Sequence, residues 1–283
     1  MPKRPGADAA SPPGTVKKPR SREKILSNEL AQDVAEYLER FAAGSKKRGG
    51  SGNHRPCREL IKQMTSIITS NAEPAAISSP KLHEVIVAYG VGRCFTATSC
   101  GLAKKGGPSA AVAPDELQKR RTFMLAHLEP VIEHLRCAWP DLVGLRRADA
   151  ARAAAADTAR AAAAVDALVC AIEEQFNRKM VSAASKLLNM CGLELPIYDS
   201  LARAALGLGN DVSYAAYLAA WAKSYAPLRS KYLEALDALL SDHDQAVTDV
   251  DLQVVQLDLM AGDVTKEWLC MRAHDVRLMR IGK

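Results

Sequence analysis

A single acidic residue stands where a helix is expected to begin. The stretch SAASKLLNMCGLELPIYDSLARAAL, residues 182–206, starts as an amphipathic helix, is interrupted by Gly192 and Pro196, and places Asp199 directly before a second helical pattern. An Asp at this position accepts hydrogen bonds from free backbone N–H groups and is favoured by the helix dipole. A fixed carboxylate can also stabilise positive charge on a substrate or deprotonate a water molecule. Asp199 is therefore a predicted helix cap and a candidate catalytic residue at once.

A polar loop upstream combines glycine with basic side chains. The segment GSKKRGGSGNHRP, residues 44–56, contains four glycines, four Lys or Arg residues and one His. Backbone N–H groups exposed by glycine, beside Lys and Arg, form cradles for phosphate. The predicted DNA contacts in this loop are Lys46, Lys47, Arg48, Asn53 and Arg55. The alternative is that the segment is a disordered linker.

Aromatic side chains recur at helical spacing in residues 211–240. They are Tyr214, Tyr217, Trp221 and Tyr225, and Pro227 follows, where it is expected to kink or end the helix. Such a stripe is most often part of a hydrophobic core. The less common use is as the wall of a pocket for a flipped base.

The stretch that contains Asp199 resembles a known family. The stretch is similar to the helix, loop and acidic helix start of the helix-hairpin-helix superfamily of DNA glycosylases. The similarity lies in the helix S-A-A-S-K-L-L-N, in the spacing of ten positions from Asn189 to Asp199, and in the segment L-P-I-Y-D-S-L-A-R that contains Asp199. The resemblance covers about 25 of 283 residues. It implies an all-α fold in which Asp199 stabilises the deoxyribose as the N-glycosidic bond breaks, and orients or deprotonates the attacking water.

The resemblance, the aromatic stripe and the basic residues near Asp199 together indicate the remaining site residues. The predicted substrate pocket contains Ser182, Lys186, Tyr198, Tyr214, Tyr217 and Trp221. Further predicted DNA contacts are Arg178, Lys179 and Arg203. The partner would be double-stranded DNA with a modified or damaged base, and no cofactor or metal would be required.

Three departures from the family's pattern refine these expectations. Bifunctional members carry a Lys nucleophile where this chain has Ser182, so we expect a monofunctional enzyme that leaves an abasic site. The glycines of the DNA-binding hairpin are replaced by EEQFNRKM, residues 173–180. Either Asn177, Arg178 and Lys179 supply side-chain contacts instead, or the resemblance is false. The histidine that often follows the Asp is replaced by Leu201.

The predicted function is hydrolysis of the N-glycosidic bond of a modified or damaged base. One extension is phage defence against modified cytosines, and housekeeping repair is the nearer alternative. The competing class is a non-enzymatic helical DNA-binding protein in which Asp199 only caps a helix. A third class is a helical interaction module with a disordered tail.

The elements that must position these residues are expected to be helices. Helical periodicity predicts them at 27–43, 57–70, 80–100, 114–137, 148–180, 182–190, 248–260 and 265–279, in addition to the two regions above. No alternating strand pattern is present. We expect a multi-helix globular fold with a disordered basic tail at residues 1–22, an N-terminal helical subdomain at 23–147 and a C-terminal one at 148–283 that carries Asp199.

Charge is concentrated near the N-terminus. The chain has a net charge of +6, and residues 1–58 hold thirteen Lys or Arg against six acidic residues. A basic arm on a nearly neutral body favours a polyanionic ligand, because each neutralised phosphate releases counterions. The alternative for residues 1–22 is a tail that only increases solubility.

Several function classes lose support. The seven cysteines contain no C-x-x-C pair, and nucleotide-binding, hydride-transfer and zinc-protease motifs are missing. No segment has the apolar length of a signal peptide or a membrane span. We therefore expect a cytoplasmic protein, and the alanine-rich segment at 148–180 suggests a bacterial source.

Overall fold

The structure is a computed structural model that describes residues 22–43, 114–147, 155–190, 193–241, 255, 259–260 and 265–283. Within these ranges the chain is helical and contains no strand, so the all-α prediction is confirmed. The helices are α1 (Arg22–Ala43), α4 (Pro114–Arg147), α5 (Ala155–Phe176), α6 (Val181–Met190), α7 (Ser200–Ala205), α8 (Tyr214–Tyr225), the 3-10 turn η4 (Ala226–Leu228), α9 (Arg229–Ser241) and α11 (Lys266–Ile281).

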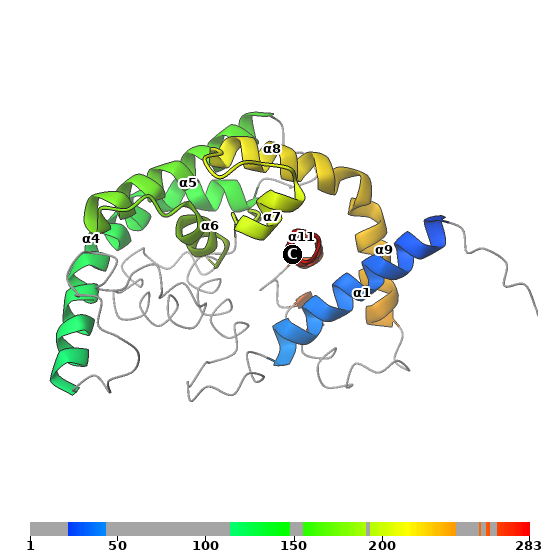
Figure 1. The fold of residues 1–283 in the computed structure, drawn as a ribbon, viewed down its shortest axis with the longest axis horizontal. Coiled ribbons are helices and arrows are strands. Elements are labelled where there is room, and N and C mark those ends of the chain that lie inside the picture. Colours follow the sequence, from blue (N-terminus) through cyan, green and yellow to red (C-terminus); the bar gives the residue numbers. More distant parts are fainter. Residues whose placement is uncertain are drawn as a thin grey trace, which may run out of the picture.

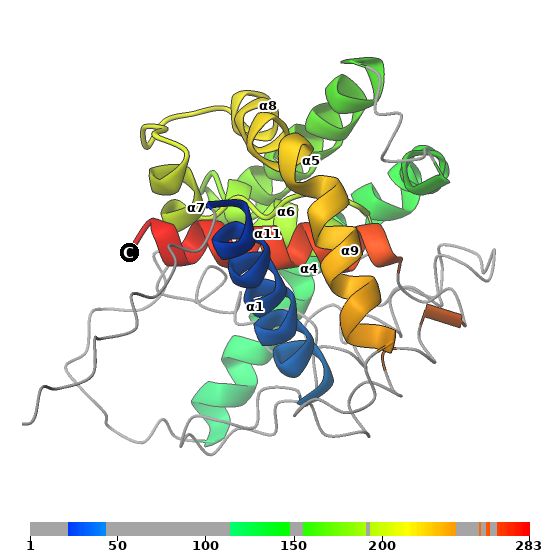
Figure 2. The same cartoon turned by 90° about the vertical axis from the view of Figure 1, so that its right-hand side faces the viewer.

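Helix α11 lies at the centre of one half of the molecule. Figure 1 looks along its axis, and α1, α7 and α9 pack around it. In Figure 2 the same helix runs across the picture behind α1 and α9. Every residue from Trp268 to Val276 is buried, including three polar ones. A helix that is buried on all sides must satisfy its polar side chains within the protein.

Helix α1 is attached to α11 by charged as well as apolar contacts. The Arg277 guanidinium donates to Asp33 at 3.1 Å and to Glu29 at 3.2 Å, and Arg280 lies 2.7 Å from Asp33. Burial raises the pKa of Asp33, while the two arginines oppose that effect. Two arginines of the last helix are therefore engaged with α1.

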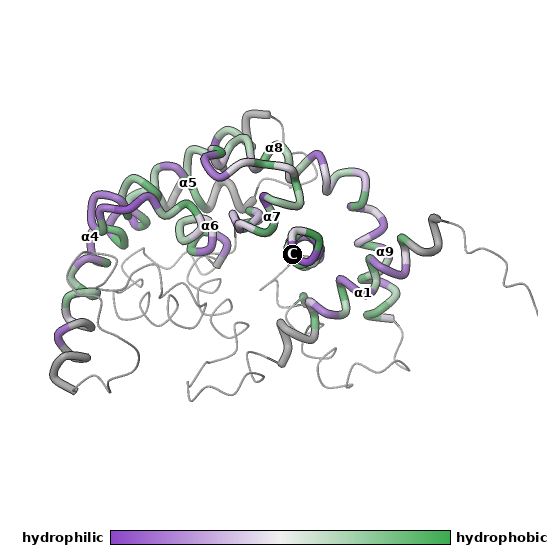
Figure 3. Tube along the Cα trace, viewed as in Figure 1, coloured by the Kyte–Doolittle hydropathy of each residue, from purple (hydrophilic) through white to green (hydrophobic). Residues whose placement is uncertain are grey.

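The other half is built on helix α5, which packs against α4, α6 and α8 (Figure 1). Hydrophobic residues are interleaved with hydrophilic ones along these helices, as Figure 3 shows, so each has an apolar side for the core. One hydrophobic cluster includes residues of α1, α4, α5, α6, α8 and α11. The helices before and after residue 148 thus share a core.

Helix α4 is longer than the sequence predicts. Its expected end at Cys137, before Trp139 and Pro140, is wrong, because the helix continues to Arg147. A proline removes one backbone donor and bends a helix without always ending it. Figure 1 shows that α4 changes direction along its length. Leu142, beyond Pro140, is 4% exposed, and its burial helps to stabilise the extension.

Other boundaries are closer to expectation. Pro227 ends α8 as predicted, since it lies in the turn η4 that leads into α9. Helix α11 begins after Thr265, whose hydroxyl accepts a hydrogen bond from the Trp268 N–H at 2.9 Å. At the other end of α11, Gly282 packs against the Leu201 carbonyl of α7. The predicted helices at 57–70 and 80–100, most of 248–260 and the tail before Arg22 lie outside the described residues.

Candidate functional site

Helices α5 and α6 form a hairpin with a four-residue connection. Asn177 follows α5 in the left-handed region, with φ of 50°, and its N–H donates to the Glu173 carbonyl at 2.7 Å. Asn adopts this conformation more readily than most side chains. Arg178 and Lys179 are exposed at the turn. Neither forms an ion pair with another residue in the described part of the chain, so both charges are available to a ligand.

A groove of about 920 Å³ lies beside this hairpin. Its walls come from α5, the hairpin turn, α6, Tyr198 and the segment that leads into α8. Six of the residues predicted from the sequence line it: Arg178, Lys179, Ser182, Lys186, Tyr198 and Tyr214. The structure thus brings together residues that are separated by up to 36 positions in the chain.

The groove lining contains charges of both signs. The hairpin turn and α6 contribute the cations Arg178, Lys179 and Lys186, and the acidic residues are Asp166 and Glu173 of α5 together with Asp211. An anionic ligand would therefore be attracted to the side formed by the turn and α6.

Asp199 caps helix α7, as predicted. Its Oδ1 accepts a hydrogen bond from the Leu201 N–H at 2.8 Å, and its backbone is extended, with φ of −120°. Oδ2 accepts no hydrogen bond from any other residue that the structure describes. The residue is half-buried. Its carboxylate is not part of the groove lining, although the preceding residue, Tyr198, is.

The aromatic stripe of α8 lies in the core. Tyr217 is 0% exposed, Trp221 is 3% exposed, and neither lines the groove. Tyr214 reaches the groove wall but is itself buried. Burial raises the pKa of both tyrosines well above the ordinary value. The structure favours the core interpretation over the pocket wall at Tyr217 and Trp221.

The Arg203 side chain bonds to the turn that follows α7. Its Nη1 donates to the carbonyls of Gly209 at 2.6 Å and Asn210 at 2.8 Å, and its guanidinium lies 5.0 Å from the centre of the Tyr198 ring. These contacts hold the turn after α7, where Gly207 has φ of 70°. Arg203 therefore helps to shape the turn after α7, and its contact with DNA stays a prediction. The other predicted contacts, Lys46, Lys47, Arg48, Asn53 and Arg55, lie outside the described residues.

Sequence reasoning missed Asp275, which is 2% exposed on α11. Its Oδ1 accepts a hydrogen bond from Trp221 Nε1 at 2.8 Å, and its Oδ2 accepts from the Ile197 N–H at 3.3 Å and from Arg272. Burial raises the pKa of Asp275 to about 6, against the opposing effect of Arg272 and the two N–H donors. The only signal in the sequence was that Asp275 falls within the helix predicted at 265–279, three positions after Arg272.

His274 is buried next to Asp275 and faces other partners. Its Nε2 lies 2.8 Å from Ser224 Oγ, and its Nδ1 lies 3.3 Å from the Tyr232 hydroxyl. Burial lowers the pKa of His274 to about 3, so the imidazole is neutral. The Ser224 hydroxyl also donates to the Trp221 carbonyl at 2.8 Å. Since neither residue lines the groove, this serine and histidine pair belongs to the core.

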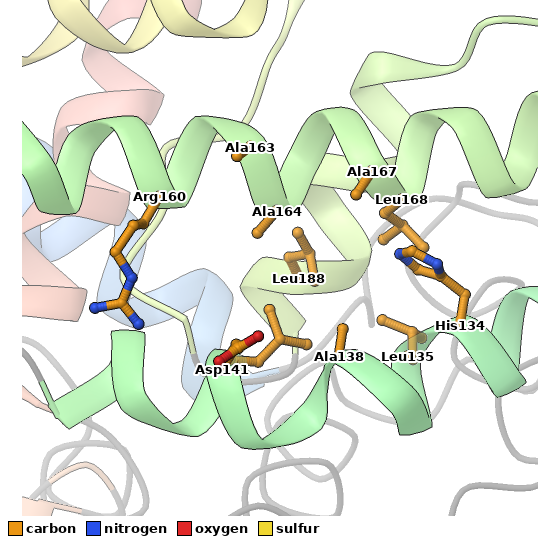
Figure 4. Close-up of a pocket in the computed structure, with 11 residues that line it drawn as sticks. His134, Leu135, Ala138, Asp141, Arg160, Ala163, Ala164, Ala167, Leu168 and Leu188 are labelled. Carbon is orange, nitrogen blue, oxygen red and sulfur yellow. The ribbon is translucent and has the colours of Figure 1, made fainter.

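A second cavity of about 330 Å³ lies between α4 and α5 (Figure 4). Its lining is mostly apolar, and Leu188 of α6 closes one side. Arg160 of α5 and Asp141 of α4 lie toward one end, and His134 points toward α5 at the other. None of these residues belongs to the predicted site.

No known protein family, curated protein or solved structure matches this chain. In the parts that the structure describes, no group of three His, Cys, Asp or Glu residues could hold a metal ion. None of the helices described above is both long and apolar enough to cross a membrane.

Proposed function

We propose that this protein binds duplex DNA through the α5–α6 hairpin and hydrolyses the N-glycosidic bond of a modified or damaged base, with Asp199 as the catalytic carboxylate. The observation that carries the proposal is that two features line one groove and a third directly follows a groove residue in the chain. These are the two unpaired cations of the hairpin turn, Lys186 one helical turn after Ser182, and Asp199 directly after the groove residue Tyr198.

The hairpin supplies the contacts that DNA requires. Arg178 and Lys179 can each neutralise a phosphate, and both lie just before the N-terminus of α6, the end of a helix that favours an anion. Asn177 takes the left-handed conformation that glycine supplies in helix-hairpin-helix proteins. This supports the idea that side chains replace some backbone contacts in the hairpin.

The groove has room for a base rotated out of the duplex. Its volume of about 920 Å³ is within the range of small-molecule sites, about 300–1,000 Å³. When the bond from C1′ to the base nitrogen breaks, its electron pair leaves with the base and the sugar becomes cationic. The Asp199 carboxylate stabilises that cation. A water oxygen then bonds to C1′, and its proton passes to Asp199 and on to the base anion, which leaves an abasic site, the neutral free base and an ionised Asp199.

The reaction stops at the abasic site in this proposal. A second, lyase step requires an amine that forms a Schiff base with the sugar. The corresponding position of the first helix holds the Ser182 hydroxyl, and Lys186 lies one turn further along α6. Lys186 instead fits a phosphate or the polar edge of the flipped base.

A non-enzymatic DNA-binding function is the second candidate. It is favoured by the use of Asp199 Oδ1 as a helix cap and by the absence of this carboxylate from the groove lining. The hairpin and its cations would then supply the whole function.

Binding of a charged sugar analogue distinguishes the two candidates without knowledge of the base. One duplex carries a cationic pyrrolidine in place of a single deoxyribose, and a matched duplex carries a neutral tetrahydrofuran. We expect the protein to bind the cationic duplex at least about tenfold more tightly, and Asp199→Asn to bind both equally. Equal binding by the unaltered protein would leave only the DNA-binding function. Base release from duplexes with modified cytosines and damaged bases then identifies the substrate.

A further inference from the structure

The chain immediately before Asp199 is held by side chains rather than by secondary structure. Residues 195–198 are buried and belong to no helix. A buried extended segment must find partners for its N–H and C=O groups, since unpaired polar groups inside a protein are costly. In most folds a neighbouring strand provides these partners. Here they come from three different helices.

Three carbonyls of this segment accept hydrogen bonds from buried side chains: Leu195 from Asn189 Nδ2 at 2.8 Å, Pro196 from the Tyr214 hydroxyl at 2.8 Å, and Ile197 from the Tyr217 hydroxyl at 2.6 Å. Two N–H groups donate to side chains in the same way: Ile197 to Asp275 Oδ2 at 3.3 Å, and Tyr198 to Ser185 Oγ at 3.1 Å. Helices α6, α8 and α11 thus all hold the four residues that lead to Asp199.

The side chain of Tyr198 adds a further connection. Its hydroxyl donates to the Val212 carbonyl at 2.7 Å, which joins this segment to the groove wall before α8. Next along the chain, Asp199 Oδ1 accepts from the Leu201 N–H. The position of the carboxylate is therefore determined by the backbone of residues 195–198, and that backbone by the five side chains.

Burial of polar groups alone does not require this arrangement. Other tyrosine hydroxyls in the same core bond to side chains elsewhere: Tyr225 to Glu267 at 3.0 Å and Tyr232 to His274 at 3.3 Å. By contrast, the hydroxyls of Tyr214 and Tyr217 both reach the segment before Asp199. Asp275 reaches it as well, although a buried carboxylate is costly to desolvate.

We propose that Tyr214, Tyr217 and Asp275 are positioning residues that fix the Asp199 carboxylate relative to the groove. The effect of this positioning on catalysis rests on the proposed glycosylase function. The placement of the cap is a property of the fold and is tested separately.

The test compares Tyr217→Phe with the matched control Tyr232→Phe. Both tyrosines are 0% exposed, and each substitution removes one buried hydroxyl while the ring remains. Amide hydrogen exchange is measured at Tyr198 and Leu201, which report on the segment and on the Asp199 cap. We expect Tyr217→Phe to speed exchange at these amides about tenfold more than Tyr232→Phe, after correction for the global stability of each variant.

The functional readout is the ratio of affinities for the cationic and neutral duplexes. Tyr217→Phe should lower this ratio about tenfold while affinity for the neutral duplex is unchanged, and Tyr232→Phe should leave both unchanged. Tyr214→Phe repeats the test at a second position. Equal exchange in the Tyr217 and Tyr232 variants would overturn the positioning role. A ratio of one in the unaltered protein would overturn the glycosylase function instead, and the exchange rates would still decide whether the cap is positioned by these side chains.

Discussion

Replacing Asp275 by Asn, or His274 by Gln, should change the slope of the unfolding free energy against pH, and the two substitutions should change it in opposite directions. These neighbours on α11 are both about 2% exposed, and burial moves their pKa values toward each other's ordinary range. The pKa of Asp275 rises from 3.8 to about 6, and that of His274 falls from 6.5 to about 3. Both shifts disfavour the charged form of the side chain.

The two residues respond oppositely to acid. As the pH falls from 6 to 4, Asp275 binds a proton in the folded protein before the unfolded chain does, which stabilises the fold. Over the same range His274 binds a proton only in the unfolded chain, which destabilises the fold. Each effect has a slope of about 1.4 kcal/mol per pH unit, or about 3 kcal/mol over the window. Between pH 4 and 6 the two contributions therefore nearly cancel.

Urea unfolding at pH 4, 5 and 6 measures the slopes. Relative to the unaltered protein, Asp275→Asn should lose stability on acidification by about 1.4 kcal/mol per pH unit, because the His274 effect is then unopposed. His274→Gln should gain stability by a similar amount. All other titrating groups are common to the three proteins, so they drop out of the difference.

Two results would refute the reasoning. One is a parallel pH dependence in all three proteins. The other is an NMR titration in which the His274 imidazole of the folded protein takes up its proton near pH 6.5, since a neutral buried imidazole should not titrate until the pH approaches 3.

Three further outcomes are expected. Asp199→Ala should lower the free energy of unfolding by about 1 kcal/mol through loss of the α7 cap, whereas Asp199→Asn keeps a capping side chain and should cost about 0.5 kcal/mol or less. Both variants should abolish base release. Equal destabilisation of the two variants in urea unfolding would contradict the capping role. Joint replacement of Arg178 and Lys179 by Ala should reduce the slope of log affinity for DNA against log salt by about 1.8, and Lys223→Ala, exposed on α8, serves as the control with an unchanged slope. Deletion of residues 1–22 should flatten the same salt dependence if that arm meets phosphates, so an identical slope would exclude such contacts.

Local chemistry was readable from the sequence. The Asp199 cap follows from an Asp placed just before a helical pattern, and the end of α8 follows from the rigid ring of Pro227. These features depend on residues a few positions apart. Pro140 gave the wrong helix end, because burial of Leu142 in the tertiary core favours continuation of α4, which no local rule contains.

The hydrogen-bond partners of the buried polar groups could not be predicted from the sequence. Asp275 meets Ile197 and Trp221 from 78 and 54 positions away in the chain, so their contact depends on how whole helices pack. The aromatic stripe of α8 could be assigned to the core from its spacing. Two hydroxyls of this stripe donate to the carbonyls of Pro196 and Ile197. These contacts depend on the path of a segment that has no periodic pattern, so the sequence did not predict them.

The central position of α11 has a consequence for synthesis. Helices α1, α7 and α9 all precede α11 in the chain, yet each packs against it. While the ribosome is still making residues before 266, α1 and α9 can pack on each other, but the faces that these helices turn to α11 stay uncovered, and for α1 that helix lies more than 220 positions downstream. We therefore expect nascent chains stalled before α11 to be captured by chaperones and to be cleaved readily by proteases, and both properties should disappear once that helix has left the exit tunnel.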